Sequence, residues 1–346
     1  VGCAMPKTAK NIWPQIVSFE NLVAAWGNVR RGKRFSPVAL EYWANLEENL
    51  LGLQQALEDR GWGPSPWRQF SVQEPKPRLI QAPACGDRVV HHALMNVMAP
   101  VFSRRFRPES FACRTGMGTH AASRRTSADL REASAKWGHP YILKADISKY
   151  FQNINHDILM HRLRRVVSDR RVLWLFETII RKSGYETRGL PIGALTSQWL
   201  ANLYLDPLDH FVKDDMGLPY YVRYMDDFVI IGPDKVWCHT ALEQITAFLE
   251  GCLLLRLNPK TGIFPASHGI NFVGYRHWTD HVLPRKSTVK RAKRTFKNFP
   301  ALYAKGKIDL PYIRARVASF TGYMRHCNGR RTLDGILEKL VLTRGE

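Results

Sequence analysis

Two adjacent acidic residues interrupt a segment of the chain that is otherwise apolar. Residues 224–231 read Tyr-Met-Asp-Asp-Phe-Val-Ile-Ile, and the aromatic and β-branched residues around the acids predict a pair of strands. A second segment, residues 143–151, begins as an apolar strand that ends in Asp146. A carboxylate in such surroundings is costly unless a cation compensates it, and a divalent metal ion is a common partner. The pattern therefore favours a metal site that joins two distant stretches of chain.

Strand geometry ranks the three acids as metal ligands. Neighbouring side chains of a strand point to opposite faces, so Asp226 and Asp227 both face Asp146 only if the turn reorients one of them. We expect Asp146 and Asp226 to bridge two Mg²⁺ ions, with Mn²⁺ as a substitute, and Asp227 to contribute from further away. Two such ions about 3.5–4 Å apart activate an attacking hydroxyl and stabilise a departing pyrophosphate oxygen. Taken alone, Asp226 and Asp227 could also form a polar hairpin turn; the strand that ends in Asp146 favours the metal site.

The chain is strongly basic, and its charge is unevenly distributed. Its 346 residues carry 51 Lys and Arg against 30 Asp and Glu, a net charge of +21, and residues 282–346 alone hold sixteen basic and four acidic residues. In this tail, apolar residues recur at helical spacing, at Val289, Ala292, Phe296 and Phe299. The positions between them are basic: Lys290, Arg291, Lys293, Arg294 and Lys297. We predict a helix with one docked face and one face directed at a polyanion such as nucleic acid; a solvated basic surface is the alternative.

Composition excludes several classes of protein. Apolar residues make up 45% of the chain, which is too many for a disordered polycation. The six cysteines include no C-x-x-C pair, which disfavours a zinc module or a disulfide framework and favours a reducing compartment. No run approaches the roughly 18 apolar residues of a membrane helix, and no signal-peptide pattern is present at the start. We expect a cytoplasmic protein with no membrane partner.

The order of the expected elements predicts an α+β fold. Strands are expected at residues 141–147, 220–231, 253–257 and 271–278, and helices at 157–182, 195–213 and 235–251. An order of strand, helices, hairpin, helix and strand is typical of a split βαβ, ferredoxin-like sheet backed by helices. The basic helical tail would form a separate lobe.

Several motifs together resemble the reverse transcriptases. The Tyr-Met-Asp-Asp hairpin at residues 224–227, preceded by Asp-x-x-x-x-Phe at residues 146–151, is similar to the palm of that family. Four further stretches resemble other parts of the family. Residues 74–80 resemble the fingers segment that reaches the triphosphate, and residues 111–116 resemble the Phe-x-x-Arg-x-Gly stretch. Residues 257–261 resemble the lysine-bearing loop after the palm, and residues 269–275 resemble the primer-gripping hairpin. The resemblance implies a right-hand polymerase fold, with an N-terminal helical extension at 1–60, fingers at 61–140, a palm at 141–282 that includes finger-side helices at 157–183, and a basic helical thumb at 283–346.

The resemblance also assigns the chemistry and the primer to particular residues. The metal ligands that it implies are Asp146, Ile147, Asp226 and Asp227, and the acids are also the catalytic residues. Lys260 would donate a proton to the leaving pyrophosphate; a loop lysine without a role is the alternative. Gly274 and Tyr275 would place backbone against the primer end, and the glycine allows a close approach. The basic residues of the tail helix would bind the duplex.

A further set of residues would bind the incoming nucleotide. Phe151, five residues after Asp146, would lie under the sugar, where a flat ring excludes a 2′-hydroxyl and so favours deoxynucleotides; core packing is the alternative. Arg78 would hold the β- and γ-phosphates with its planar guanidinium, with Lys76 a weaker candidate for the same task. The other implied nucleotide-binding residues are Ile192, Gly193, Ser197 and Gln198.

The segment 189–198 distinguishes between branches of the family. Ile192 stands where group II intron and retroviral enzymes usually have Gln, and Gln198 stands where they have Pro. This form resembles the reverse transcriptases of diversity-generating retroelements. The resemblance implies an error-prone enzyme that copies a template-repeat RNA into cDNA from dNTPs, with errors at template adenines, binds the RNA/cDNA duplex and works with a small basic accessory variability protein, in a bacterium or phage. The alternatives are a non-mutagenic prokaryotic enzyme of the defence or group II intron-like kind, and a catalytically silent RNA-binding scaffold.

Overall fold

The chain folds into two compact units, each discontinuous along the sequence. The structure is a computed structural model that describes residues 8–73, 77–182 and 186–343. The first unit comprises Val1–Arg114, Ile147–Gly217 and Gln244–Pro259, and the second comprises Thr115–Asp146, Leu218–Glu243 and Lys260–Glu346. The helix α11 (Lys235–Leu253) contributes to both units.

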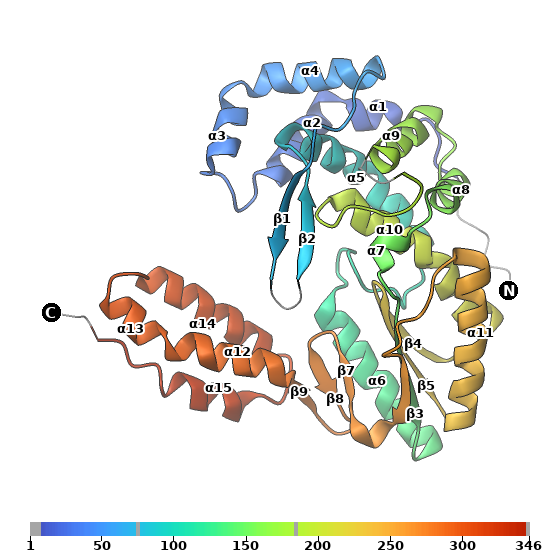
Figure 1. Ribbon diagram of the computed structural model, residues 1–346, viewed down its shortest axis with the longest axis vertical. Coiled ribbons are helices and arrows are strands. Elements are labelled where there is room, and N and C mark those ends of the chain that lie inside the picture. Colours follow the sequence, from blue (N-terminus) through green and yellow to red (C-terminus); the bar gives the residue numbers. More distant parts are fainter. Residues whose placement is uncertain (1–7, 74–76, 183–185, 344–346) are drawn as a thin grey trace. The chain divides into compact units, whose positions relative to one another are not determined.

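The first unit is mainly helical (Figure 1). Its elements are α1 (Trp13–Val17), α2 (Phe19–Val29), α3 (Pro37–Ala44), α4 (Leu46–Glu58), β1 (Arg68–Val72), β2 (Arg78–Ala82), α5 (Cys85–Arg105), α7 (Tyr150–Asn153), α8 (His156–Val166), α9 (Arg170–Arg181), α10 (Leu195–His210) and a π-helical turn η1 (Phe211–Asp215). Helix α5 is central, because α2 and α10 both pack against it. Its residues Val90, Leu94, Met98 and Phe102 recur every four positions and are fully buried.

Two side chains show why helices of this unit begin where they do. The hydroxyl of Ser18 accepts a hydrogen bond from the N–H of Asn21 at 3.2 Å and so caps the start of α2. The carboxylate of Asp169 accepts from the N–H of Arg171 at 3.1 Å and so caps α9. It also accepts from the N–H of Trp13 at 3.1 Å, so one carboxylate holds the starts of α9 and α1 together.

The second unit is built on a four-stranded antiparallel sheet. Its strands are β3 (Tyr141–Asp146), β4 (Tyr220–Tyr224), β5 (Asp227–Gly232) and β6 (Gly262–Pro265), in the spatial order β4-β5-β3-β6. Because β5 is antiparallel to both β3 and β4, it lies between two strands that run in the same direction. This is the split βαβ arrangement that the sequence predicted. Helix α6 (Thr119–Trp137) packs against β4 and β5.

A small sheet and a helical lobe complete the second unit. A short helical turn η2 (Ala266–His268) leads into the strands β7 (Ile270–Phe272), β8 (Tyr275–His277) and β9 (Val282–Pro284), which form a three-stranded antiparallel sheet. The lobe consists of α12 (Lys286–Lys297), α13 (Phe299–Ala304), α14 (Leu310–Met324) and α15 (Arg330–Leu337). Its own core is formed by Phe296, Phe299, Ile313, Phe320, Met324 and Ile336. Val289 and Ala292 pack against that core, so the apolar face predicted for this helix is the docked one.

One expectation about secondary structure needs correction, and one helix was missed. The strand expected at residues 253–257 is absent: α11 continues to Leu253, and Leu257 makes only an isolated bridge to Ile147. Leu254 has φ of +51°, which turns the chain out of the helix instead of extending it into a strand. The long helix α6 was not anticipated from the sequence. Within the described residues, no helix combines the length and apolar character needed to cross a membrane.

Candidate active site

Three acidic residues meet where β3 ends and the β4–β5 hairpin turns. Asp146, the last residue of β3, pairs directly with Asp227, the first residue of β5. Opposed residues of an antiparallel pair place their side chains on the same face, so these two carboxylates lie together. Met225, with φ of +57°, and Asp226 form the two-residue turn between the strands. This turn reorients Asp226 so that its carboxyl group shares a hydrogen bond with that of Asp146.

Crowding and burial disfavour the charged forms of these acids. Burial raises the pKa of Asp226 to about 6, and the neighbouring charge of Asp146 contributes to the rise. Burial also raises the pKa of Asp227, whereas the ammonium group of Lys144 opposes that shift. The site therefore holds more negative charge than its own residues neutralise, and a cation beside Asp146 and Asp226 would stabilise their ionised forms.

The donor set fits a metal ion that brings other ligands with it. Among the described residues, no group of three or more His, Cys, Asp or Glu side chains is arranged to hold an ion by itself. Mg²⁺ commonly binds in this incomplete way, through one or two carboxylates together with substrate phosphates and water. The hydrogen-bonded pair of Asp146 and Asp226 supplies those carboxylates. Ile147, the fourth ligand implied by the resemblance, is buried and bridges to Leu257 through its backbone.

Lys144 was missed from the sequence and lies within the site. Its ammonium group forms an ion pair with Asp227 and lies 5.5 Å from the centre of the Phe272 ring. Since Lys144 precedes Asp146 by two residues in β3, both side chains lie on the same face of the sheet. The alternation of side chains along a strand was the signal in the sequence that could have placed Lys144 beside Asp146. The ammonium group of Lys144 therefore offsets part of the negative charge that Asp227 could offer to a metal ion.

Arg223 was also missed, and it supports the turn from within the sheet. Its side chain is fully buried in β4, and its guanidinium donates a hydrogen bond of 2.9 Å to the backbone carbonyl of Met225. Met225 is the first residue of the turn and directly precedes Asp226. A buried guanidinium is costly to desolvate, and here it is used to fix the backbone that carries a catalytic candidate.

The hairpin that resembles a primer grip lies in the same unit. Its turn consists of Val273 and Gly274, with φ of +42° and +93°, between β7 and β8. The ring of Tyr275 is buried, and its hydroxyl donates a hydrogen bond of 3.0 Å to the carbonyl of Tyr323. The side chain of Tyr275 is therefore engaged within the protein, which leaves backbone at this turn as the group available to a primer.

In the first unit, β2 brings together several nucleotide-binding candidates. Arg78 is exposed at the start of β2 and pairs with Val72 across the β1–β2 ribbon. The N–H of Gln81, further along β2, donates a hydrogen bond of 2.8 Å to the carbonyl of Ile192. Gly193 has φ of +135°, and a Cβ there would lie 2.6 Å from the Gln81 carbonyl oxygen, so only glycine fits. The segment 189–198 is thus fastened to the β1–β2 ribbon.

The other candidates of the first unit differ in exposure. Phe151 is half-buried in α7 and makes an edge contact of 5.6 Å between ring centres with Tyr150. Ser197 is buried in the first turn of α10, whereas Gln198 is exposed and accepts a weak hydrogen bond from the thiol of Cys113 at 3.5 Å. Lys76 lies outside the described residues.

The remaining candidates belong to the second unit. Lys260 is exposed in the turn before β6, the strand that neighbours β3. The five predicted duplex-binding residues of α12 are all exposed: Lys290, Arg291, Lys293, Arg294 and Lys297. They occupy the surface of α12 that the docked residues Val289, Ala292 and Phe296 leave exposed, as the helical spacing predicted.

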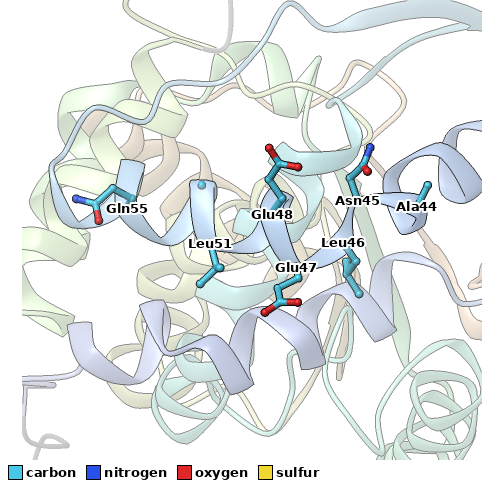
Figure 2. A pocket seen from close by; sticks show the side chains of 8 residues that line it. Ala44, Asn45, Leu46, Glu47, Glu48, Leu51 and Gln55 are labelled. Carbon is cyan, nitrogen blue, oxygen red and sulfur yellow. The ribbon is translucent and has the colours of Figure 1, made fainter.

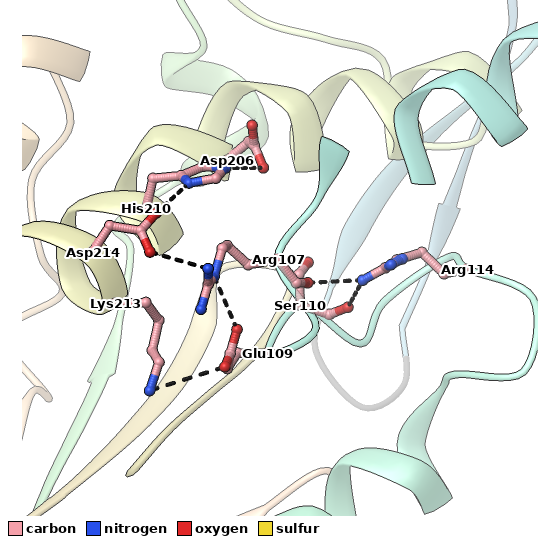
Figure 3. Close-up of polar contacts among 8 residues, drawn as sticks. All are labelled: Arg107, Glu109, Ser110, Arg114, Asp206, His210, Lys213 and Asp214. Atoms are coloured by element: carbon pink, nitrogen blue, oxygen red, sulfur yellow. Dashed lines mark hydrogen bonds and ion pairs between the residues drawn. The ribbon is translucent and has the colours of Figure 1, made fainter. Parts of the chain in front are cut away.

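Ion pairs stabilise the loop that follows α5 in the first unit (Figure 3). Arg107 pairs with Glu109 at 3.3 Å and with Asp214 of η1 at 3.0 Å, and Lys213 approaches Glu109 at 3.9 Å. Arg114, the arginine of the Phe-x-x-Arg-x-Gly stretch, donates to the carbonyls of Ser103, Arg107 and Ser110 at 2.8–3.1 Å. Those three acceptors account for a local structural role of Arg114.

A surface hollow in the first unit does not suit a nucleotide. It has a volume of about 750 Å³ and lies over α4, where Leu46, Glu47, Glu48 and Leu51 line it (Figure 2). Two acidic side chains and no basic one contribute to its lining. A phosphate group would be repelled there, so this hollow is not part of the candidate site.

Comparison with known proteins agrees with these observations. The family described as "Reverse transcriptase (RNA-dependent DNA polymerase)" matches residues 72–277, more than half of the chain, including all three acids. The chain belongs to the reverse transcriptase family. The right-hand polymerase fold and the enzyme class expected from the sequence, RNA-directed DNA polymerase, are thereby confirmed at the level of the family.

Individual proteins similar to this reverse transcriptase cover different shares of their own length. Protein YkfC of Escherichia coli is 26% identical in an alignment of length 275 that covers 67% of this chain and 72% of YkfC. Group II intron-encoded protein LtrA of Lactococcus lactis is 23% identical in an alignment of length 320 that covers 71% of this chain and 52% of LtrA. The chain thus spans about half the length of LtrA. The solved telomerase of Candida albicans aligns with 74% of this chain and 55% of its own, at 13% identity and a TM-score of 0.48.

Proposed function

We propose that this chain is itself an RNA-directed DNA polymerase that adds deoxynucleotides to a primer paired with template RNA. The observation that carries the proposal is the hydrogen-bonded carboxyl pair of Asp146 and Asp226, with the pKa of Asp226 raised to about 6. Such a pair at the end of a split βαβ sheet suits divalent metal ions, of which Mg²⁺ is our choice. When bound, the ions supply activation of the primer hydroxyl and stabilisation of the departing pyrophosphate.

The residues of the chain would divide the remaining work. Asp146 and Asp226 hold and orient the ions. Asp227 contributes from further away, and the ammonium group of Lys144 offsets part of its charge. Phe151 excludes the 2′-hydroxyl of a ribonucleotide, and Lys260 donates a proton to pyrophosphate as it leaves.

The other proposed roles concern substrate phosphates, the primer and the duplex. Arg78 and Lys76 hold the triphosphate, aided by the segment that contains Ile192, Gly193, Ser197 and Gln198. Backbone at Gly274 and Tyr275 contacts the primer end, and the exposed basic face of α12 binds the duplex backbone. We propose the domain boundaries on the same basis: an extension at 1–60, fingers at 61–140, a palm at 141–282 and a thumb at 283–346.

Primer extension tests this function. The purified chain is given an RNA template, an annealed primer, dNTPs and Mg²⁺, and extension is expected. Asp226→Asn should abolish extension, while Asp280→Asn, which removes an exposed carboxylate of the same unit, should leave it intact. If the wild-type chain binds RNA but extends no primer under any priming condition, the silent scaffold is the better description.

We further propose that the enzyme belongs to the diversity-generating branch, copies a template-repeat RNA with errors at adenines, and works with an accessory variability protein. The support is Ile192 in place of Gln: its sec-butyl side chain offers contact but no hydrogen bond to brace a nascent base pair. Loss of such a directional contact costs on the order of 1–3 kcal/mol of discrimination at most. The similarity to LtrA favours the competing description, a non-mutagenic group II intron-like enzyme.

Sequencing of the cDNA separates these two descriptions. Wild-type cDNA should carry substitutions opposite template adenines, and Ile192→Gln should reduce them. Faithful wild-type cDNA would support the group II intron-like alternative. Unchanged adenine errors in Ile192→Gln would show that Ile192 does not cause them.

A further inference from the structure

The turn of the β7–β8 hairpin has a backbone conformation that needs support. Val273 has φ of +42° and Gly274 has φ of +93°. A β-branched residue rarely adopts a positive φ, whereas glycine does so at no steric cost. A strained residue of this kind persists only where surrounding contacts hold it in place. The contacts around Val273 and Gly274 therefore determine the shape of the turn.

The carbonyl of Gly274 is held by two donors from the chain that follows the hairpin. The N–H of Arg285 donates to it at 3.0 Å, and the hydroxyl of Tyr323 in α14 donates to it as well. The Tyr323 hydroxyl also accepts from the N–H of Arg285 at 3.2 Å and is hydrogen-bonded to the side chain of Thr288. This single hydroxyl thus joins the hairpin turn, the start of α12 and the end of α14.

The ring of Tyr323 supports the hairpin in a second way. It stacks on the ring of Tyr275 with centres 4.8 Å apart and planes 17° apart. Tyr275 in turn donates its hydroxyl proton to the carbonyl of Tyr323 at 3.0 Å, and His120 of α6 lies 3.2 Å from the same hydroxyl. Each tyrosine hydroxyl therefore donates to a backbone carbonyl at or next to the other tyrosine: Tyr275 donates to the carbonyl of Tyr323, and Tyr323 donates to the carbonyl of Gly274. A contact of this kind fixes a relative position more narrowly than apolar packing alone.

We propose that Tyr323 is a positioning residue for primer extension: by holding the Gly274 carbonyl, it keeps the Val273–Gly274 turn in the shape that presents its backbone to the primer end. The inference rests on the proposed polymerase function for its catalytic consequence. Its structural part, that the Tyr323 hydroxyl holds the turn, can be measured without catalysis. Tyr323 lies 49 residues after Gly274, so its hydroxyl couples the helical lobe to the hairpin.

The test removes the hydroxyl and keeps the ring. Tyr323→Phe retains the stacking on Tyr275, and Tyr312→Phe, in the exposed first turn of the same helix α14, is the matched control. Hydrogen exchange of the amides in residues 270–277 is measured on the full chain. Single-encounter primer extension then measures the number of nucleotides added for each binding event, the apparent affinity for dNTP and the Mg²⁺ dependence.

In Tyr323→Phe, amide exchange should accelerate at least threefold in the hairpin but not in the α12–α15 core. The nucleotides added for each encounter should fall several-fold, while the apparent dNTP affinity and Mg²⁺ dependence stay as in the wild type. Tyr312→Phe should change none of these. Unchanged hairpin exchange would overturn the proposal, and so would faster exchange throughout the lobe, because Tyr323 would then be an ordinary core residue.

A second variant, Gly274→Ala, tests whether Tyr323 acts through the hairpin turn, independently of the proposed polymerase function. Gly274→Ala places a Cβ 3.8 Å from the Tyr323 ring at a backbone φ that alanine disfavours, so it disturbs the turn and leaves the hydroxyl in place. If Tyr323 acts through the turn, the effects of Tyr323→Phe and Gly274→Ala on hairpin exchange should be less than additive. Full additivity would contradict the proposal. If the wild-type chain extends no primer, the polymerase function fails, and the exchange data still decide the role of Tyr323.

Discussion

Asp146 and Asp227 are directly opposed across the β3–β5 pair, one at the end of its strand and the other at the start. Apolar side chains stabilise this pair of strands, because residues 228–231 of β5 and Ile142, Leu143 and Ala145 of β3 are all buried. A slip of one residue would place the side chains of Asp227 and Asp146 on opposite faces of the sheet. The same apolar residues that form the sheet therefore assemble the site. The cost of the assembly is the burial of the acids, to which the repulsion between them adds.

The first prediction concerns the stability that the folded protein loses when Asp226 is ionised in this site. The pKa of Asp226 rises from its ordinary value of 3.8 to about 6 in the folded protein. A carboxyl group shifted upward contributes its full stability below pH 3.8, and this contribution is lost as the pH rises through about 6. Asp226→Asn should therefore stabilise the metal-free protein at pH 7, by about 1–2 kcal/mol after allowance for partial exposure. Thermal unfolding in EDTA measures it.

Metal addition provides the control for this first prediction. If Mg²⁺ binds the folded state through Asp226 as proposed, it should raise the unfolding temperature of the wild type more than that of Asp226→Asn. The exposed Asp280→Asn should match the wild type in both conditions. A metal-free Asp226→Asn protein that is less stable than the wild type would contradict this account of the site's electrostatics.

The second prediction is a pH dependence of metal affinity. With a pKa of about 6, the carboxyl group of Asp226 is mostly ionised at pH 7.5 and mostly protonated at pH 5.5. Since a metal ion binds the carboxylate and not the acid, apparent Mg²⁺ affinity should fall roughly fourfold between these pH values. Titration calorimetry, or competition with Mn²⁺ followed by its paramagnetic signal, measures the change. Equal affinity at both pH values would show that Asp226 is not a ligand.

The sequence predicted the acids and the sheet because both have strong local signals. Apolar strands that end in Asp146 and begin with Asp227 are visible as interrupted apolar runs. Helix α6 gave no such signal, since the residues that it buries are mostly small or polar: Ala122, Ser123, Thr126, Ser127, Asp129, Leu130 and Ala133. The apolar run at residues 253–255 suggested a strand, but the positive φ of Leu254 is a backbone property that composition does not reveal.

The supporting residues of the site were hidden for a different reason. Lys144 and Arg223 are single basic residues within apolar strands, and their meaning depends on partners that only the pairing of strands provides. Likewise, Tyr323 appears in the sequence as one more aromatic residue of the tail helices. Its contact with Gly274 joins residues that are far apart in the chain.

The third prediction concerns Arg223. Its replacement by Leu would remove the hydrogen bond to the Met225 carbonyl, and a hydrogen bond that involves a charged group contributes about 1.5–3 kcal/mol. We expect Arg223→Leu to lose at least about that much stability and to lose primer extension. Arg223→Lys, which keeps the charge but not the planar fork, should fold better than Arg223→Leu and extend poorly. Denaturant unfolding and extension assays measure both effects.

The control for Arg223 is an exposed arginine of the same unit. Arg131→Leu, on the exposed face of α6, should change stability by no more than about 0.5 kcal/mol. If Arg223→Leu were as stable as Arg131→Leu and fully active, the hydrogen bond to the turn would have no function in holding Asp226.

The last prediction concerns the exposed basic face of α12. Each lysine or arginine that neutralises a phosphate releases counterions, so duplex affinity should fall as salt rises, with a slope of about −0.9 in a log–log plot for each contact. Replacing Lys290, Arg291 and Lys293 by Gln should therefore make the slope shallower by about 2–3 and leave Asp226-dependent metal binding unchanged. Removal of three equally exposed lysines elsewhere in the lobe, Lys305, Lys307 and Lys339, is the matched control. If both triple variants lose the same slope, the lobe attracts nucleic acid through its overall charge, and α12 has no special part in binding the duplex.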